Sequence, residues 1–149
     1  MSNQRTRFIL DQLPLRGVHV NLEQVWQHIV GQKNYPAPIA RALGELVAAG
    51  ALLAANLKFD GTFILQVQGT GVLKLLVAEA TSEQTCRGTA RFDDSIEIAD
   101  DTSLQDLMGE QGQFVLTLQP RQGEMWQGIV GLQGTSIAQM LANYLAQSE

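Results

Sequence analysis

The sequence predicts an α+β fold in which antiparallel strands pack around a central helix. The segment 36–58 would be apolar on every side of a helix, so we expect it to be buried on more than one face. After Phe59 the apolar residues recur with a period of two, which is typical of strands, and turn signals separate several such runs.

The N-terminal segments 5–10 and 16–20 are short and mixed, and fit either strands or an irregular lead-in. Asn21 and Gln24 then have the spacing of a capping box, and apolar residues follow at helical intervals. These signals predict a helix over about residues 22–31. It ends before Pro36, because the residue before a proline is biased toward extended geometry.

The central helix has prolines in its first turn, where a missing N–H costs no hydrogen bond. It carries no charged side chain between Glu45 and Lys58. Small residues at spacings of three or four form a thin ridge along which a sheet can approach: Gly44, Ala48, Ala51 and Ala55.

Asp60-Gly61 predicts a hairpin turn, since a type I′ turn needs positive φ at both central positions. A strand with alternating side chains follows, and Gly69-Thr70-Gly71 predicts the next turn. VLKLLVAEA and TCRGTARF read as further strands joined by the polar segment 81–85. Together they predict an antiparallel meander.

The C-terminal third contains two capping signals. Thr102 or Ser103 opens a short helix, and Ser136 with Gln139 opens an amphipathic helix over 136–148. Between them, QFVLTLQP and EMWQGIVGLQG flank the loop 121–123, whose length and glycine suit a hairpin.

The 149 residues predict a single domain, 1–149. A composition of 45% hydrophobic and 17% charged residues with a net charge of -5 is that of a soluble protein and disfavours nucleic acid as a partner. No export signal is visible, and the longest nearly uncharged run, 46–57, is about half of the roughly 20 residues a membrane span needs. We therefore expect a cytoplasmic protein without a membrane partner.

Candidate catalytic groups do not converge in the sequence. Asp60 is better explained as a turn residue than as an acid or base, and His19 and His28 lack the spacing of metal ligands on one helix face. Cys86 is the only cysteine, and strand alternation places Arg87 on the opposite face, which favours a buried structural thiol.

Two further signals also have structural explanations. Ser136 lacks the second glycine of a nucleophile elbow, so capping accounts for it. The carboxylates of 93–101 lack the pattern of a calcium loop, and the glycines of QGTG and QGIVGLQG lack that of a phosphate loop. We expect no enzyme and no catalytic, metal-binding or cofactor-binding residue in this chain.

Five segments of the sequence form a recognisable set, which in order read YPAPIARALGELVAAGALLAANLKFDG, LQVQGTG, CRGTARF, WQGIVGLQG and YLAQSE. Together they resemble the N-terminal part of the redox-regulated holdase chaperones of the thirty-three-kilodalton heat shock protein family. The resemblance extends from about Arg16 to the last residue. It implies a stress-response chaperone of the bacterial cytoplasm that holds unfolding proteins without ATP. It also implies a three-layer β/α/β fold, with the buried helix between antiparallel or mixed sheets.

The family resemblance further implies a C-terminal domain whose four cysteines bind zinc when reduced and form disulfide bonds when oxidised. None of those cysteines matches Cys86, so the redox switch has no counterpart in this chain and the chain is expected to be a C-terminally truncated core. Without the family's following strands, one edge strand of a sheet would have unpaired backbone N–H and C=O groups. We therefore expect a homodimer formed by edge pairing or strand exchange.

The partners expected of such a core are unfolded or aggregation-prone client proteins. A holdase needs exposed apolar area, not convergent polar groups. Alternation groups the candidate client-binding residues on one face of two strands: Phe63, Leu65, Val67, Phe114, Leu116 and Leu118. In the alternative hypothesis, the fragment is an inert folding and dimerisation scaffold, and client binding resides in the missing linker.

Overall fold

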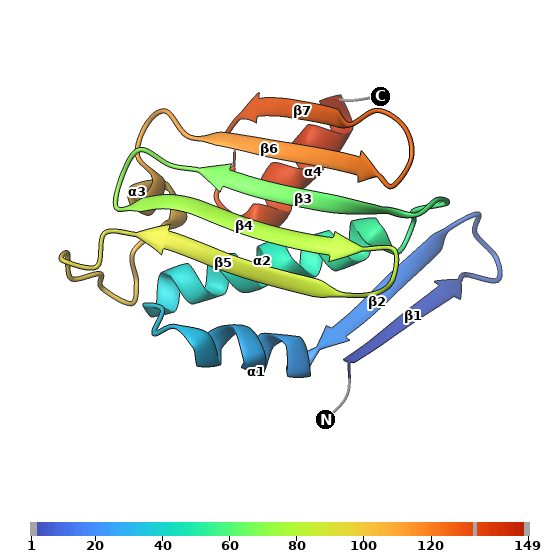
Figure 1. Ribbon diagram of the computed structural model, residues 1–149, viewed down its shortest axis with the longest axis horizontal. Helices are drawn as coiled ribbons and strands as arrows, with labels where there is room; N and C mark the ends of the chain where they lie inside the picture. Colours follow the sequence, from blue (N-terminus) through green and yellow to red (C-terminus); the bar gives the residue numbers. More distant parts are fainter. Residues whose placement is uncertain (1–2, 133, 148–149) are drawn as a thin grey trace.

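The computed structural model describes residues 3–132 and 134–147, which form two antiparallel sheets and the helices packed on them (Figure 1). The larger sheet has 5 strands in the order β5-β4-β3-β6-β7, and the smaller sheet is the 2-stranded hairpin β1-β2. The α+β class predicted from the sequence is therefore confirmed.

The predicted meander forms one half of the large sheet. It consists of β3 (Gly61–Gln68), β4 (Leu73–Thr81) and β5 (Cys86–Phe92), each antiparallel to the next. The predicted hairpin of β6 (Gln113–Pro120) and β7 (Trp126–Gly131) joins the free side of β3 through β6. The edges of the sheet are therefore β5 and β7.

Helix α3 (Leu104–Met108) is held against the β3–β4 turn. Its cap is Ser103, as predicted, whose side chain accepts a hydrogen bond from the Asp106 N–H at 3.1 Å. At its other end, the Met108 carbonyl accepts from the N–H groups of Thr70 and Gly71 at 2.6 and 2.9 Å. The glycine-rich turn thus binds the C-terminus of α3.

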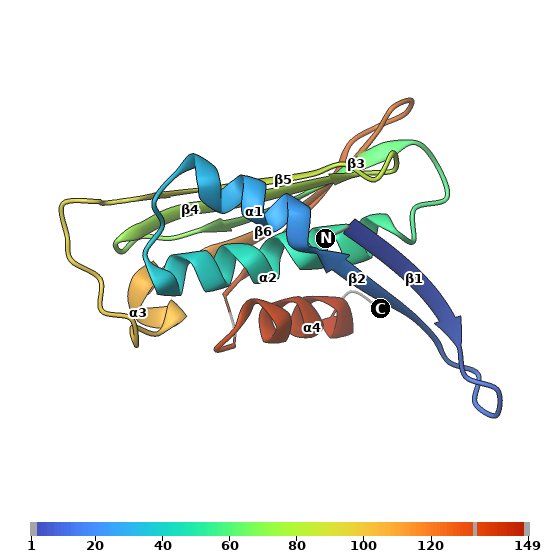
Figure 2. The same cartoon turned by 90° about the horizontal axis from the view of Figure 1, so that it is seen from below.

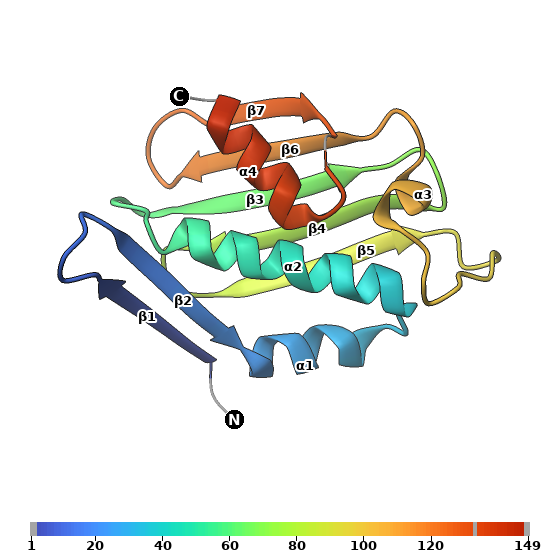
Figure 3. The same ribbon diagram turned by 180° about the vertical axis from the view of Figure 1, so that it is seen from behind.

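Helix α2 (Ala37–Ala54) is the predicted central helix and lies across the large sheet (Figure 3). It contacts β4, β5 and β3 on one side and β2 and α4 on the other. By length and composition alone it could also cross a membrane. Its buried residues, however, belong to the same core as those of the sheet, which is the behaviour of a core helix.

The second β layer is the hairpin of β1 (Asn3–Ile9) and β2 (Arg16–Leu22), so the N-terminal segments are strands. The hairpin meets the C-terminal part of α2 and then extends away from the large sheet (Figure 2). The Arg7 guanidinium donates to the Ala55 carbonyl at the end of α2, where a cation also offsets the negative end of the helix dipole.

Helix α1 (Glu23–Gln32) has nearly the predicted range, but the predicted capping box is wrong. The cap position is Leu22, and the Asn21 side chain accepts from the Glu23 N–H, not from the Gln24 N–H three residues further on. The N–H groups of Gln24 and Val25 instead donate to the Asn3 side chain at 3.1 and 3.2 Å. The true cap therefore comes from β1, which is remote in the sequence.

The Asp60-Gly61 hairpin prediction is also wrong, because a helix and not a strand precedes this turn. Asp60 lies in the connection from α2 to β3, and neither Asp60 nor Gly61 is among the described residues with positive φ, which are Gln84, Gly109, Gly123 and Gly134. Position 61 requires glycine for a steric reason, because a Cβ there would lie only 2.9 Å from the Gln119 carbonyl oxygen on β6.

Helix α4 (Ile137–Gln147) begins as predicted, while Ser148 lies outside the described residues. The Ser136 hydroxyl accepts from the Gln139 N–H at 3.1 Å, and the Gln139 side chain accepts from the Thr135 N–H at 2.8 Å. The Ile137 N–H donates to Glu45 of α2 at 3.1 Å. This bond fixes the start of α4 on the central helix.

Candidate functional site

The six residues predicted to bind clients form three directly opposed pairs between β3 and β6. The pairs are Phe63–Leu118, Leu65–Leu116 and Val67–Phe114. They lie on the face of the sheet that α2 and α4 cover, and the last two pairs are at most 4% exposed. In this fold they are core residues, and a client could reach them only after the helices moved. Their role in client binding stays a prediction.

The other face of the large sheet is open. Figures 1 and 2 show α2 and α4 on one side of the strands, and no described helix packs on the opposite side. On this open face the register aligns Val77, Gln66, Val115 and Ile129 in one row across β4, β3, β6 and β7. Leu75 and Ile64 lie in neighbouring rows, so apolar side chains extend across most of this face. Ile129 is 56% exposed and Ile64, Leu75 and Val77 are half-buried, whereas Val115 is only 3% exposed.

Polar pairs flank this patch. Glu79 and Arg87 form an ion pair at 2.7 Å between β4 and β5, as expected from the placement of Arg87 opposite Cys86. The Gln127 amide donates to the Thr117 hydroxyl at 3.0 Å between β6 and β7. An apolar patch with a polar rim is a typical interaction surface.

Sequence reasoning missed this patch, although a signal was present. The strands VLKLLVAEA and QFVLTLQP carry apolar residues on both faces, which indicates strands that are covered on both sides. Gln66 and Gln68 on β3, however, indicate a polar outer face. The apolar row across four strands depends on the strand register, which the sequence alone does not give.

The candidate titratable groups lie on separate elements. His19 is exposed on β2, and His28 on α1 is hydrogen-bonded to Gln32 at 2.9 Å. The Asp60 carboxylate is 3.6 Å from the Arg121 guanidinium. Among residues 3–132 and 134–147, no group of three or more His, Cys, Asp or Glu side chains could hold a metal ion.

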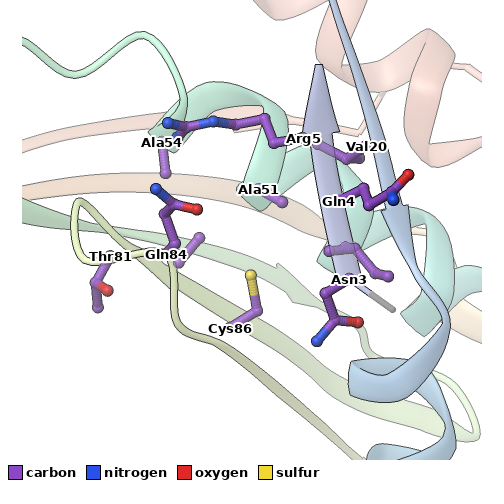
Figure 4. A pocket seen from close by; sticks show the side chains of 11 residues that line it. Asn3, Gln4, Arg5, Val20, Ala51, Ala54, Thr81, Gln84 and Cys86 are labelled. Atoms are coloured by element: carbon purple, nitrogen blue, oxygen red, sulfur yellow. The ribbon is translucent and has the colours of Figure 1, made fainter. Parts of the chain in front are cut away.

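Cys86 borders a small pocket between β5, the β1–β2 hairpin and the end of α2 (Figure 4). The pocket holds about 70 Å³, well below the roughly 300 Å³ at which small-molecule sites begin. The thiol is half-buried, and this burial raises its pKa. A raised pKa reduces the thiolate fraction, which is the opposite of what an activated nucleophile needs.

Residues 3–149 match the family described as Hsp33 protein. The chain belongs to the Hsp33 family. Among curated relatives, it is 68% identical over 145 residues to the 33 kDa chaperonin of Neisseria meningitidis serogroup A, covering 97% of this chain and 48% of that protein. It is 66% identical over 148 residues to the 33 kDa chaperonin of Neisseria gonorrhoeae, covering 99% of this chain and 49% of that protein.

A solved structure of the Hsp33 family has the same fold. The crystal structure of the 33 kDa chaperonin from Thermotoga maritima matches with a TM-score of 0.76 at 24% identity, over 88% of this chain and 46% of that chain. The chain spans about half the length of the Hsp33 relatives it matches. The four-cysteine zinc site implied by the family resemblance does not fit its residues, because Cys86 is the only cysteine.

Proposed function

We propose that this chain is the client-holding core of an ATP-independent holdase chaperone. The proposal is supported by membership of the Hsp33 family and by relatives named 33 kDa chaperonin. The observation that carries it is the open apolar face of the large sheet, since unfolded proteins bind to exposed apolar area. We expect no enzymatic activity and no cofactor in this chain.

The expected setting follows from the same family. We propose a bacterial cytoplasmic protein of the heat shock response, folded as one domain, whose partners are unfolding client proteins. Neither nucleic acid nor membrane is expected as a partner. Redox control through zinc and disulfide bonds would reside in a region that supplies four cysteines. With Cys86 alone, holding by this chain should not depend on oxidant or reductant.

Homodimerisation by edge pairing is part of this proposal, and the two sheet edges differ in how well they are protected. On β5, the Ala90 carbonyl accepts from Lys33 at 3.3 Å, and the Ala90 N–H donates to the Tyr35 hydroxyl at 3.4 Å. The edge strand β7 has no such cover from the described residues and exposes Trp126 and Ile129. A second chain would therefore pair at β7.

A scaffold role is the alternative function. It is favoured by the burial of Leu65, Val67, Phe114 and Leu116, which leaves fewer apolar side chains exposed than expected. In that case the chain would fold and dimerise, and client affinity would belong to the part of the relatives that it does not span.

Suppression of aggregation tests the proposal. The chain should reduce light scattering from a thermally unfolding, unrelated enzyme without ATP and equally with peroxide or dithiothreitol. Val77→Gln combined with Ile129→Gln should weaken suppression several-fold, because both side chains lie on the open face. The matched control is Val30→Gln with Ile96→Gln, two exposed positions outside it.

Two results would contradict the holdase function. One is scattering unchanged by the wild-type chain, together with negligible fluorescence of a naphthalene sulfonate dye, which favours the scaffold. The other is an equal loss of suppression in the control pair, which would remove the open face as the binding surface.

A further inference from the structure

An open groove lies between the β1–β2 hairpin and the C-terminal end of α2. Figure 3 shows the hairpin extending beyond the large sheet next to this end of the helix. Its volume is about 1050 Å³, slightly above the roughly 300–1,000 Å³ of small-molecule pockets. An open groove of this size suits an extended segment of another chain better than a small ligand.

The hairpin wall of the groove combines positive charge with apolar area. Strand pairing places Arg7 opposite Val18, and Ile9 opposite Arg16, so cations and aliphatic side chains alternate diagonally on one face. Ile9 is 72% exposed, which is unusual for a side chain of its size.

The opposite wall continues this combination. The end of α2 and the segment after it contribute Leu52 and Leu57 as apolar contacts and Lys58 as a further cation. The Arg7 guanidinium donates to the Ala55 carbonyl, whereas the side chains of Arg16 and Lys58 have no hydrogen bond or ion pair to another described residue. Their charges are therefore available to a ligand.

None of the described residues that line the groove carries a carboxylate, although the chain as a whole has a net charge of -5. Asp60 and Glu83, which lie elsewhere, pair with Arg121 at 3.6 and 2.7 Å. Asp11 belongs to the hairpin loop outside the lining. The groove is thus locally basic on an otherwise acidic protein, and an anionic ligand would be steered toward it.

We propose that this groove binds an extended client segment in which carboxylate side chains alternate with apolar ones. The carboxylates would pair with Arg16 and Lys58, and the apolar side chains would cover Ile9, Val18 and Leu52. A nucleic acid strand would satisfy the charges but would leave the aliphatic side chains without matching partners. The inference rests on the proposed holdase function and adds a preference among clients.

The test uses the 149-residue chain and fluorescein-labelled peptides of equal length and equal apolar content. At alternate positions the peptides carry Glu, Gln or Lys. In fluorescence anisotropy at low ionic strength, the Glu peptide is expected to bind at least tenfold more tightly than the Gln peptide. The Lys peptide should bind most weakly. The preference should shrink at high salt, because the charges are exposed.

The decisive variant is Arg16→Gln with Lys58→Gln, which should abolish the preference for the Glu peptide. Arg7 is kept, because it caps α2. The matched control is Lys74→Gln with Arg91→Gln, which removes the same charge from exposed positions on β4 and β5. Circular dichroism and thermal melting confirm that both variants fold.

Three results would overturn the inference: equal binding of the Glu and Gln peptides, equal losses in variant and control, or full displacement of the Glu peptide by single-stranded DNA at equal concentration. Suppression of aggregation is measured in parallel. A chain that suppresses aggregation without the peptide preference would refute this inference alone, whereas a chain that does neither would also refute the holdase function.

Discussion

Gly88 on β5 offers a quantitative test of how the sheet packs on the central helix. A Cβ at this position would lie 2.6 Å from a methyl carbon of Val47 and 3.3 Å from one of Leu43. Val47 is 3% exposed and β-branched, so it cannot turn away freely. Overpacking costs about 1–3 kcal/mol, against about 0.5–1 kcal/mol gained by replacing a strand glycine with alanine.

We therefore expect Gly88→Ala to lower the free energy of unfolding by about 1–2 kcal/mol. Val47→Ala alone should cost about 2 kcal/mol through lost burial and a cavity. The double variant should be less destabilised than the sum by about 1–2 kcal/mol, because the new methyl group occupies the vacated space. Urea denaturation followed by circular dichroism measures all three values.

The control is Gly31→Ala near the end of α1, where a Cβ would meet nothing within 4 Å. This variant should be stabilised by up to about 1 kcal/mol, as expected for a helical glycine. An unchanged or increased stability of Gly88→Ala, or strict additivity in the double variant, would show that β5 does not pack on α2 at this distance.

Further predictions concern Cys86 and the β7 edge. Burial raises the pKa of Cys86, so the pH midpoint for alkylation by iodoacetamide should be higher in the folded chain than in urea; equal midpoints would contradict this. In the unfolded chain the Cys86 thiol has its ordinary pKa, so it loses its proton at a lower pH than in the folded chain. The free energy of unfolding should therefore fall as the pH rises above that ordinary pKa. Ile129→Lys should raise the dissociation constant of the dimer, measured by light scattering, at least tenfold. The control Ile96→Lys, at a loop position where the isoleucine is 47% exposed, should leave this constant unchanged. Equal effects of the two variants would exclude pairing at β7.

Local chemistry accounts for what the sequence predicted correctly. Ser103 and Ser136 cap helices because their partners, Asp106 and Gln139, lie three residues further on. The strands of the meander were found because alternation and glycine turns are also local signals. The central helix was found because segment 36–58 lacks a polar face.

The predictions failed where the partner is remote. Asn3 caps α1 from 21 residues upstream, and Gly61 is required by the Gln119 carbonyl on β6. The composition of the open face could not be derived from the sequence for the same reason, although the apolar residues on both faces of single strands were a signal. Val77, Val115 and Ile129 share a row only through pairings between strands that are distant in the sequence.

The Asn3 cap has a consequence for the order of folding events. Helix α1 has 10 residues, and isolated helices shorter than about 12–15 residues are marginal in water. The N–H groups in its first turn find their acceptor, the Asn3 side chain, only after β1 has paired with β2, because this pairing brings Asn3 to the start of the helix. Residues 23–32 should therefore gain protection from hydrogen exchange no earlier than the hairpin does, so that a tertiary step precedes a secondary one.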